Sequence, residues 1–289
     1  MTHRFPIGCL VVAAVVAVSS PAAAQASRMT AERLAELAKK PTPRLADGKF
    51  DLNGTWDHLG GIEFVRPQSL DNGSVCVVGC PPAPAARAGG AGGRAGGPPA
   101  APPAPNFPKY KPELLAKVKD LNERQVEVDT ALQCQPPGVP RIGPPAKIVQ
   151  TAREVLFLYD DVNGSFFRII PTDGRAHRKD VPASYLGDAI GRYEGDTLVV
   201  ETVSFNEETW LTDNGAFHSK DLKVVERLRR VGDTIQYEAT AHDPAVLVEP
   251  WKERTQTLWL TDREIEESPR CEDRDLDLIK DGSHHDNPR

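Results

Sequence analysis

The chain has 289 residues, with 41 acidic and 35 basic side chains and a formal net charge of −6. This balance argues against a nucleic-acid partner, because phosphate backbones are bound by an excess of Lys and Arg. The length allows one large β domain or two smaller ones. We favour one domain, because the strand patterns are concentrated after residue 134.

The first 26 residues have the composition of a secretory signal peptide. Arg4 supplies a short basic region, residues 7–18 are apolar, and residues 22–26 offer two small-residue cleavage sites. The apolar run is too short for a membrane span, and no later run is long enough. We therefore expect an exported protein, periplasmic or secreted, with no membrane insertion after signal cleavage.

Three segments are expected before the β-rich region. Residues 27–80 should hold a short helix over 30–40 and a strand containing Trp56, whose indole we expect in the core. Residues 81–106 are almost entirely Pro, Ala and Gly, which bury too little surface to offset ordering entropy, so a disordered insertion is expected. In residues 107–140, apolar spacing predicts a helix over 112–129, followed by a rigid Pro-rich connection.

Residues 141–272 carry most of the strand signal. Asn163-Gly164, Gly195-Asp196 and Gly232-Asp233 are turn sequences between β-rich runs. Strands are predicted over 147–151, 154–160, 166–172, 185–193, 197–205, 222–230, 234–242, 251–260 and 264–269. About 8–10 antiparallel strands joined mostly by short turns predict an up-and-down barrel, since closure removes exposed edges. The tail, residues 273–289, is charged and expected to be flexible.

One charged residue interrupts an apolar row of the predicted barrel. Side chains alternate between the two faces of a strand, so Glu226 shares a face with Leu222, Val224 and Leu228. A buried carboxylate must be paired or protonated. We expect Glu226 to point inward and to pair with Arg175, Arg192 or a histidine; a structural ion pair at the barrel rim is the plainer alternative.

Four cysteines remain after signal removal, at positions 76, 80, 134 and 271. An even number in an exported protein predicts disulfides. Three pairings are possible, and we favour Cys76–Cys80 with Cys134–Cys271. A four-cysteine zinc site is the alternative, but the spacing lacks the paired knuckles typical of zinc.

Several short motifs occur in a fixed order along the second half of the chain. They are C-x-P-P-G-x-P-R at 134–141, T-D-G-R-x-H at 172–177, G-R-Y-E-G-D-T-L-V-V-E-T at 191–202, F-N at 205–206, H-S at 218–219, V-E-R at 225–227 and D-P…P-W across 243–251. Over residues 129–272 the chain thereby resembles a large family of exported bacterial proteins of unknown function, abundant in soil and aquatic bacteria. The Pro-Ala-Gly insertion and the C-x₃-C pair depart from that pattern. The resemblance implies a lipocalin-like barrel and no settled activity.

The polar residues of these motifs are the candidate site. The candidates for acid–base chemistry are His177, His218, Glu226 and Asp173, and those for ligand binding are Arg175, Tyr185, Arg192, Asn206 and Trp210. Histidine suits proton transfer near neutral pH, and loops at one barrel mouth could bring both histidines together. Asp173 and Arg175 could instead simply hold a turn. The spacing of the histidines matches no metal-binding motif, no nucleophile motif is present, and no cofactor is expected.

Three functions fit these observations. The first is a barrel that binds a small, partly apolar organic molecule in its cavity. The second is a cofactor-free acid–base enzyme, a lyase, isomerase or hydrolase, acting on a small organic substrate. The third is a structural or interaction protein that uses the Pro-Ala-Gly insertion as a flexible arm. The first two are favoured, and the sequence leaves the oligomeric state open.

Overall fold

The structure is a computed structural model that describes residues 29–58, 68–69, 75–76, 106–161 and 163–267. The predicted signal peptide, nearly all of the Pro-Ala-Gly insertion and the predicted tail lie outside these residues. No helix within them is long and apolar enough to cross a membrane.

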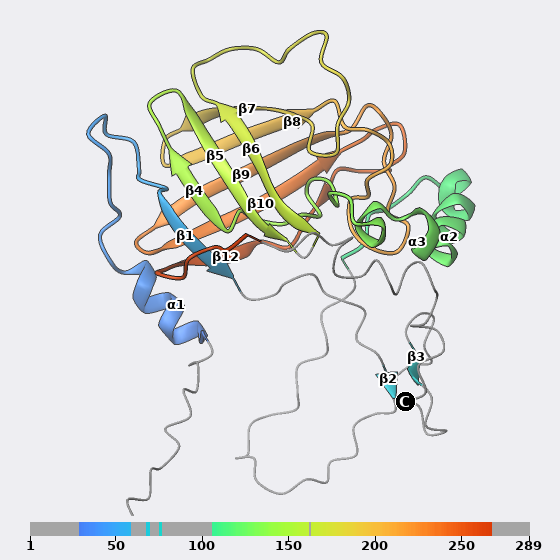
Figure 1. Cartoon of the computed structure of the whole chain (residues 1–289), viewed down its shortest axis with the longest axis horizontal. Coiled ribbons are helices and arrows are strands. Elements are labelled where there is room, and N and C mark those ends of the chain that lie inside the picture. The colour runs from blue at the N-terminus through green and yellow to red at the C-terminus, as the bar shows by residue number, and fades with distance from the viewer. Residues whose placement is uncertain (1–28, 59–67, 70–74, 77–105, 162, 268–289) are drawn as a thin grey trace, which may run out of the picture.

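Nine strands of the described chain form one antiparallel sheet that curls into a nearly closed barrel (Figure 1). In spatial order they are β6 (Gly164–Pro171), β5 (Glu154–Asp161), β4 (Lys147–Gln150), β1 (Gly54–His58), β12 (Gln256–Thr261), β10 (Thr234–His242), β9 (Lys223–Val231), β8 (Thr197–Val203) and β7 (Asp188–Glu194). A short strand, β11 (Trp251–Lys252), pairs with β10, while β2 (Gln68–Ser69) and β3 (Val75–Cys76) form a separate pair. The predicted mainly-β antiparallel barrel is confirmed.

Strand β1 joins the two halves of the up-and-down order by pairing with β12, the last strand of the described chain. This strand lies between β4 and β12, with Thr55 opposite both Lys147 and Thr261. The barrel therefore takes one strand from the N-terminal segment as well as those from 141–272. The last predicted strand, over 264–269, does not form as far as residue 267, because β1 already occupies the free edge of β12.

The helices are short and lie outside the barrel wall (Figure 1). The first, α1 (Ala31–Ala38), begins at Thr30, whose side chain accepts a bond from the Arg33 N–H. The helix predicted over 112–129 is divided into η1 (Pro112–Leu114), α2 (Leu115–Glu123) and α3 (Gln125–Val128), and η2 (Thr130–Gln133) follows. The division falls at Arg124, whose backbone leaves the helical region.

The number of strands determines how the barrel closes. Each strand runs antiparallel to its neighbour from β6 round to β7, so with nine strands the two end strands run in the same direction. A parallel pair cannot be joined by a tight hairpin and needs a longer crossover, here residues 172–187. β6 and β7 close the barrel by packing, without a hydrogen-bonded ladder. We call this junction the seam.

The barrel interior is filled by side chains. The inward residues of β10 alternate as expected from the sequence, and Ile235, Tyr237, Ala239 and Ala241 are all buried. Trp56 anchors the core, as predicted, and its indole N–H donates to the Leu52 carbonyl at 3.0 Å. A barrel of about this strand number has an interior just wide enough for such packing.

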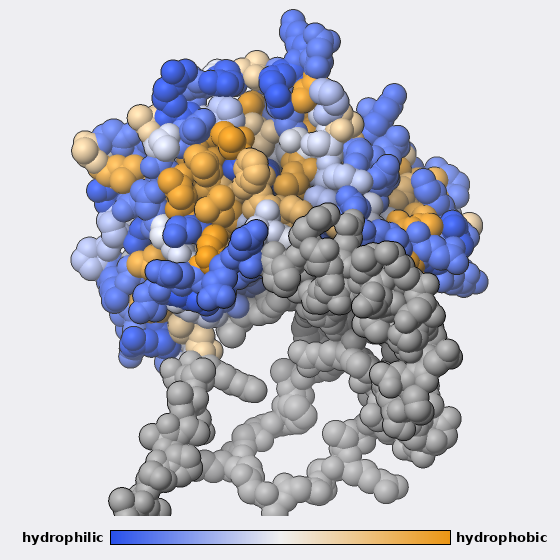
Figure 2. All heavy atoms as spheres, viewed as in Figure 1, coloured by the Kyte–Doolittle hydropathy of each residue, from blue (hydrophilic) through white to orange (hydrophobic). Residues whose placement is uncertain are grey.

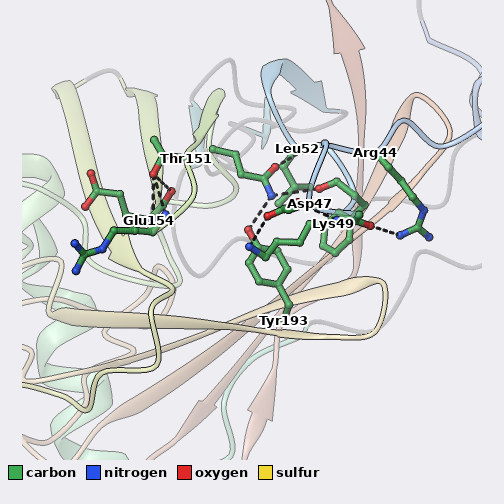
Figure 3. Close-up of polar contacts among 11 residues, drawn as sticks. Arg44, Asp47, Lys49, Leu52, Thr151, Glu154 and Tyr193 are labelled. Carbon is green, nitrogen blue, oxygen red and sulfur yellow. Dashed lines mark hydrogen bonds and ion pairs between the residues drawn. The ribbon is translucent and has the colours of Figure 1, made fainter.

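The N-terminal segment covers one end of the barrel (Figure 3). The Gln150 side chain accepts a bond from the Leu52 N–H at 2.7 Å and donates to the Tyr193 hydroxyl at 2.8 Å, which ties this segment to β4 and β7. Arg44 also reaches Asp196, in the turn between β7 and β8, at 2.8 Å. These bonds satisfy polar groups that the barrel end would otherwise leave exposed.

A second apolar cluster covers the opposite end. Loop residues such as Phe205, Trp210 and Leu247 pack there on the ends of β9 and β10, and the partly buried Val118 and Leu121 of α2 pack against them. The predicted helical stripe thus has the packing role expected of it. Both ends of the barrel are therefore covered. The irregular part of the barrel wall is the seam, where β6 and β7 share no hydrogen-bonded ladder.

The seam generates the first prediction. A Cβ atom at Gly191 would lie 2.9 Å from Ile170 Cγ2 and 3.0 Å from Thr172 Cγ2, across the seam. Gly191→Val should therefore lower the free energy of unfolding by about 1–3 kcal/mol through overpacking, measured by denaturant titration. Arg192→Val, at the exposed neighbouring position, should change it by less than about 0.5 kcal/mol. Equal effects of the two changes would contradict a tightly packed seam.

Candidate functional site

A groove of about 450 Å³ lies on the outer surface at the seam. Strand β6 contributes Phe167, Ile169 and Pro171 to one wall, and β7 contributes Asp188 and Ile190 to the other. The crossover supplies the remaining residues: Arg175, Ala176, Arg178, Ser184, Leu186 and Gly187. Arg168 and Ala189, whose side chains belong to the inner rows of their strands, complete the lining. The groove exists because the parallel end strands require this long crossover.

The β6 wall of the groove is unusually apolar for an outer surface. Phe167 is 61% exposed and Ile169 is 50% exposed. On β5 their cross-strand partners are Leu158 and Leu156, which also face outward. Apolar side chains gather over these strands in Figure 2. Such a patch beside a concave groove is typical of a ligand or partner site.

The rim of the groove is formed by an ion-paired turn after β6. Arg175 donates to Asp173 through Nε at 2.9 Å and Nη2 at 2.6 Å, and Arg153 adds a third bond at 3.2 Å. The bond from Arg175 and its charge hold the pKa of the Asp173 carboxyl well below its usual range. Gly174 has a φ of +84°, which suits glycine. Asp173 thus holds Arg175 in place, which matches the structural alternative for this pair.

His177 is fixed between two carboxylates beside the groove. Its Nδ1 lies 2.9 Å from Asp188 Oδ2, and its Nε2 lies 3.5 Å from Glu201 Oε1. Asp188 also accepts bonds from the Arg178 side chain at 2.7 Å and the Arg178 N–H at 3.2 Å. Burial raises the pKa of Asp188, but the bonds from His177 and Arg178 outweigh it and the net shift is downward. Asp188 is therefore a charged anchor for the crossover.

Behind the groove, Arg168 forms a buried ion pair with Glu226. The Arg168 Nη2 lies 2.7 Å from Glu226 Oε2, and Nη1 donates to Oε1 at 3.0 Å. Arg168 also donates to Tyr159 and Thr202, and the Tyr237 hydroxyl donates to Glu226 Oε1. Glu226 is fully buried. The prediction that it points inward is confirmed, whereas the predicted partners, Arg175, Arg192 or a histidine, are wrong.

The partner of Glu226 is not one that we named. Arg175 pairs with Asp173 and Arg192 with Glu194, both at the surface. Arg168 could have been found by the rule that singled out Glu226, since it shares the inward row of β6 with Phe166 and Ile170. An arginine and a glutamate, each in an otherwise apolar row, are the expected signature of a buried ion pair.

A second carboxylate lies close to this pair. Glu253 follows β11, and its backbone N–H donates to the Ala239 carbonyl at 2.9 Å. Its Oε1 accepts a bond from Gln256 at 3.3 Å, while Oε2 is buried without a hydrogen-bond partner in the described chain. Burial, reinforced by the charge of Glu226, raises the pKa of Glu253 to about 7.

His218 has a different environment from His177. Its Nδ1 lies 2.8 Å from the Ser219 carbonyl, which can only accept, so Nδ1 carries the proton. Its Nε2 then accepts from the Thr209 hydroxyl at 2.8 Å. Burial lowers the pKa of His218, which favours this neutral form. His177, His218 and Glu226 thus each contact different partners, and neither histidine bonds to the other or to Glu226 within the described chain.

The remaining candidates are spread over the surface and the end cluster. Tyr185 bonds to Glu208 at the surface, and the Asn206 N–H donates to the Ser184 carbonyl. Trp210 is buried in the end cluster, 5.6 Å from the Arg141 guanidinium. Arg141, from the Pro-rich motif, also pairs with Asp129 and Asp213. Of the predicted ligand-binding residues, Arg175 is the one that lines the groove.

The cysteine predictions fall largely outside the described residues. Cys80 and Cys271 lie beyond them, so both disulfide pairings stay predictions. Within the described ranges, no group of three or more His, Cys, Asp or Glu side chains could hold a metal ion.

The buried ion pair generates the second prediction. Arg168→Met should lower the free energy of unfolding by about 3–5 kcal/mol near pH 7, because it leaves the Glu226 charge buried and unpaired. The double variant Arg168→Met/Glu226→Gln should recover a large part of that loss, measured by urea denaturation in a double-mutant cycle. Additive losses would mean that the two side chains do not stabilise each other.

The third prediction concerns Glu253 and pH. The folded-state pKa of about 7 lies above the ordinary glutamate value of 4.5, so this group's contribution to stability is complete below pH 4.5 and is lost as pH rises through 7. At about 1.4 kcal/mol per unit, the loss reaches up to about 3 kcal/mol.

Glu253→Gln should therefore stabilise the protein relative to the unchanged chain at pH 8 more than at pH 5, as measured by chemical denaturation at both values. Glu249→Gln, at an exposed side chain in the same segment, is the control and should show no such difference. A Glu253→Gln effect that does not vary with pH would exclude the raised pKa.

Comparison with known proteins adds no assignment: no protein-family model, curated protein or solved structure matches the chain. The resemblance described from the motifs stays a prediction, and function must be argued from the geometry of the seam.

Proposed function

We propose that the protein is an exported barrel that binds a small, partly apolar organic molecule in the seam groove. The observation that carries the proposal is the exposure of Phe167 and Ile169 on one wall of a groove whose rim is charged. A site with apolar walls and a few fixed polar groups is the usual form of a small-molecule pocket.

The size and energetics of the groove support this proposal. Its volume of about 450 Å³ lies within the range of roughly 300–1,000 Å³ typical of ligand pockets. Fully burying a side chain such as Phe or Ile contributes about 1.5–3 kcal/mol. Covering the exposed half of Phe167 and of Ile169 would thus give on the order of 1 kcal/mol each.

The groove takes the place of the barrel interior as the binding site. The sequence favoured a ligand inside the barrel, but Tyr237, Phe157 and Trp56 are fully buried there among other core side chains. The floor of the groove reaches this core through Arg168. A ligand at the seam would therefore lie against the buried ion pair without displacing the core.

A cofactor-free acid–base enzyme is the second candidate. The observation that favours it is the contact of His177 with Asp188, because a carboxylate that orients a histidine ring is a recurring feature of general bases. Asp188 lines the groove. In the described structure, however, His177 Nε2 is buried beside Glu201, so proton transfer to a ligand would require the ring to move.

The fourth prediction tests the groove with the neutral fluorescent probe N-phenyl-1-naphthylamine. Phe167→Ser/Ile169→Ser should weaken binding of the probe by about tenfold or more, since two apolar contacts of about 1 kcal/mol each are lost. The matched control is Leu115→Ser/Val126→Ser, which removes two similarly exposed apolar side chains from α2 and α3.

Equal weakening in both variants would contradict a binding site at the seam, as would a failure of the unchanged protein to bind the probe. The enzyme alternative is tested by incubating the protein with a metabolite mixture and following the masses. Conversion of a compound by the unchanged protein, but not by His177→Gln, would favour catalysis over simple binding.

A further inference from the structure

The charged side chains that line the groove offer a ligand many more hydrogen-bond donors than acceptors. Four of its lining residues carry charge: Arg168, Arg175, Arg178 and Asp188. The one carboxylate is already engaged by His177 Nδ1, Arg178 Nε and the Arg178 N–H. What the groove can still offer a ligand must therefore come mainly from donors.

Arg178 has the greatest free donor capacity. Its side chain is 68% exposed, and its bonds to Asp188 use Nε and the backbone N–H. Within the described chain, this leaves the two terminal amino groups without a hydrogen-bond partner. The bond at Nε nevertheless fixes the guanidinium plane, so these two donors are held in position before a ligand arrives. Such preorganisation reduces the entropy lost on binding.

Two further donors lie in the same lining. Arg175 uses Nε and Nη2 for Asp173, which leaves Nη1. The Ser184 hydroxyl accepts a bond from the Gly187 N–H at 3.0 Å, and its own proton can be donated. A planar guanidinium with two adjacent free donors matches the two oxygens of a carboxylate better than it matches a hydroxyl.

Arg168 carries a further donor behind the groove wall. The Nε of Arg168 is buried and has no hydrogen-bond partner among the described residues, although both terminal amino groups of this side chain are bonded. An unsatisfied buried donor costs about 1–3 kcal/mol. Because the Arg168 side chain belongs to the inner row of β6, this donor lies behind the groove wall, and the groove's accessible donors are those of the rim.

We propose that the ligand of the seam groove is an amphipathic organic anion with a carboxylate head group. The apolar part would lie along Phe167 and Ile169, and the carboxylate would bind Arg178 and Arg175 at the rim. This inference rests on the proposed function and names the chemical class of the ligand. A cationic ligand is disfavoured, because the carboxylate of Asp188 is already bonded and three arginines line the same groove.

The experiment uses three compounds of equal chain length with different head groups: octanoate, 1-octanol and octylammonium. Each is titrated against the mature protein loaded with N-phenyl-1-naphthylamine at pH 7, and displacement of the probe is measured. Octanoate should bind at least tenfold more tightly than either of the others. Because exposed charges are screened by salt, this preference should decrease between 20 mM and 500 mM NaCl.

Variants of the rim locate the head group. Arg175→Gln/Arg178→Gln should reduce the preference for octanoate over octanol to about threefold or less, while the affinity for octanol stays within twofold. The matched control is Arg192→Gln, which removes an arginine of comparable exposure, 55% against 53% for Arg175, from outside the groove lining. It should leave the preference unchanged.

The possible failures can be told apart. If none of the compounds displaces the probe and the probe itself does not bind, the proposed binding function is wrong. If octanol and octanoate bind equally, the groove binds ligands but the carboxylate assignment is wrong. A preference for octanoate that survives Arg175→Gln/Arg178→Gln, or that is lost equally in Arg192→Gln, would also overturn the assignment to this rim. Circular dichroism of each variant verifies that the barrel remains folded.

Discussion

An odd number of antiparallel strands imposes the main constraint on this barrel. Going round the sheet from β6 to β7, the direction alternates at every step, and the two end strands therefore meet in parallel. The usual means of closing an up-and-down barrel, a hairpin between antiparallel neighbours, is excluded at this one junction. The long crossover over residues 172–187 is a consequence of that count, and the groove lies where this crossover meets two end strands that share no hydrogen-bonded ladder.

The Arg168–Glu226 pair holds β6, one of the two end strands at the seam. Arg168 belongs to an end strand, whereas Glu226 belongs to β9, and Thr202 of β8 accepts a bond from the same guanidinium. The ion pair thus connects β6 to the far side of the sheet through the interior, where the ladder between β6 and β7 is missing. Polar bonds across the core take over part of the role that backbone bonds play elsewhere in the wall. A buried ion pair contributes little net stability compared with apolar packing, so its value here lies in fixing the position of β6.

Local features of the structure could be predicted from the sequence, whereas its long-range relations could not. The alternation of Leu222, Val224, Glu226 and Leu228 was sufficient to place the glutamate inside the barrel. The same alternation along β6 contained Arg168, but it does not reveal which of several arginines lies opposite Glu226. That relation depends on the order of strands around the barrel. The position of β1 and the formation of the groove depend on the same order, because a strand pattern specifies a face and not a partner. The histidines illustrate this limit as well: His177 and His218 both belong to polar motifs, yet one contacts the carboxylates of Asp188 and Glu201 and the other packs edge-on against Phe205 of the end cluster.

The place of β1 in the wall has a consequence for how the chain reaches its folded state. This strand pairs Thr55 with Thr261, positions separated by nearly the whole of the described sequence. Contacts of such high sequence separation form slowly, because a long loop must lose its conformational entropy before the pairing contributes. The hairpins of β5–β6 and β7–β10 involve near neighbours and can form early. Until β1 arrives, the facing edges of β4 and β12 carry unpaired backbone groups, which are ready templates for association with other chains. The sheet is therefore continuous only once the first strand of the described residues has found the last, and the interval before they meet is the period of greatest risk of aggregation.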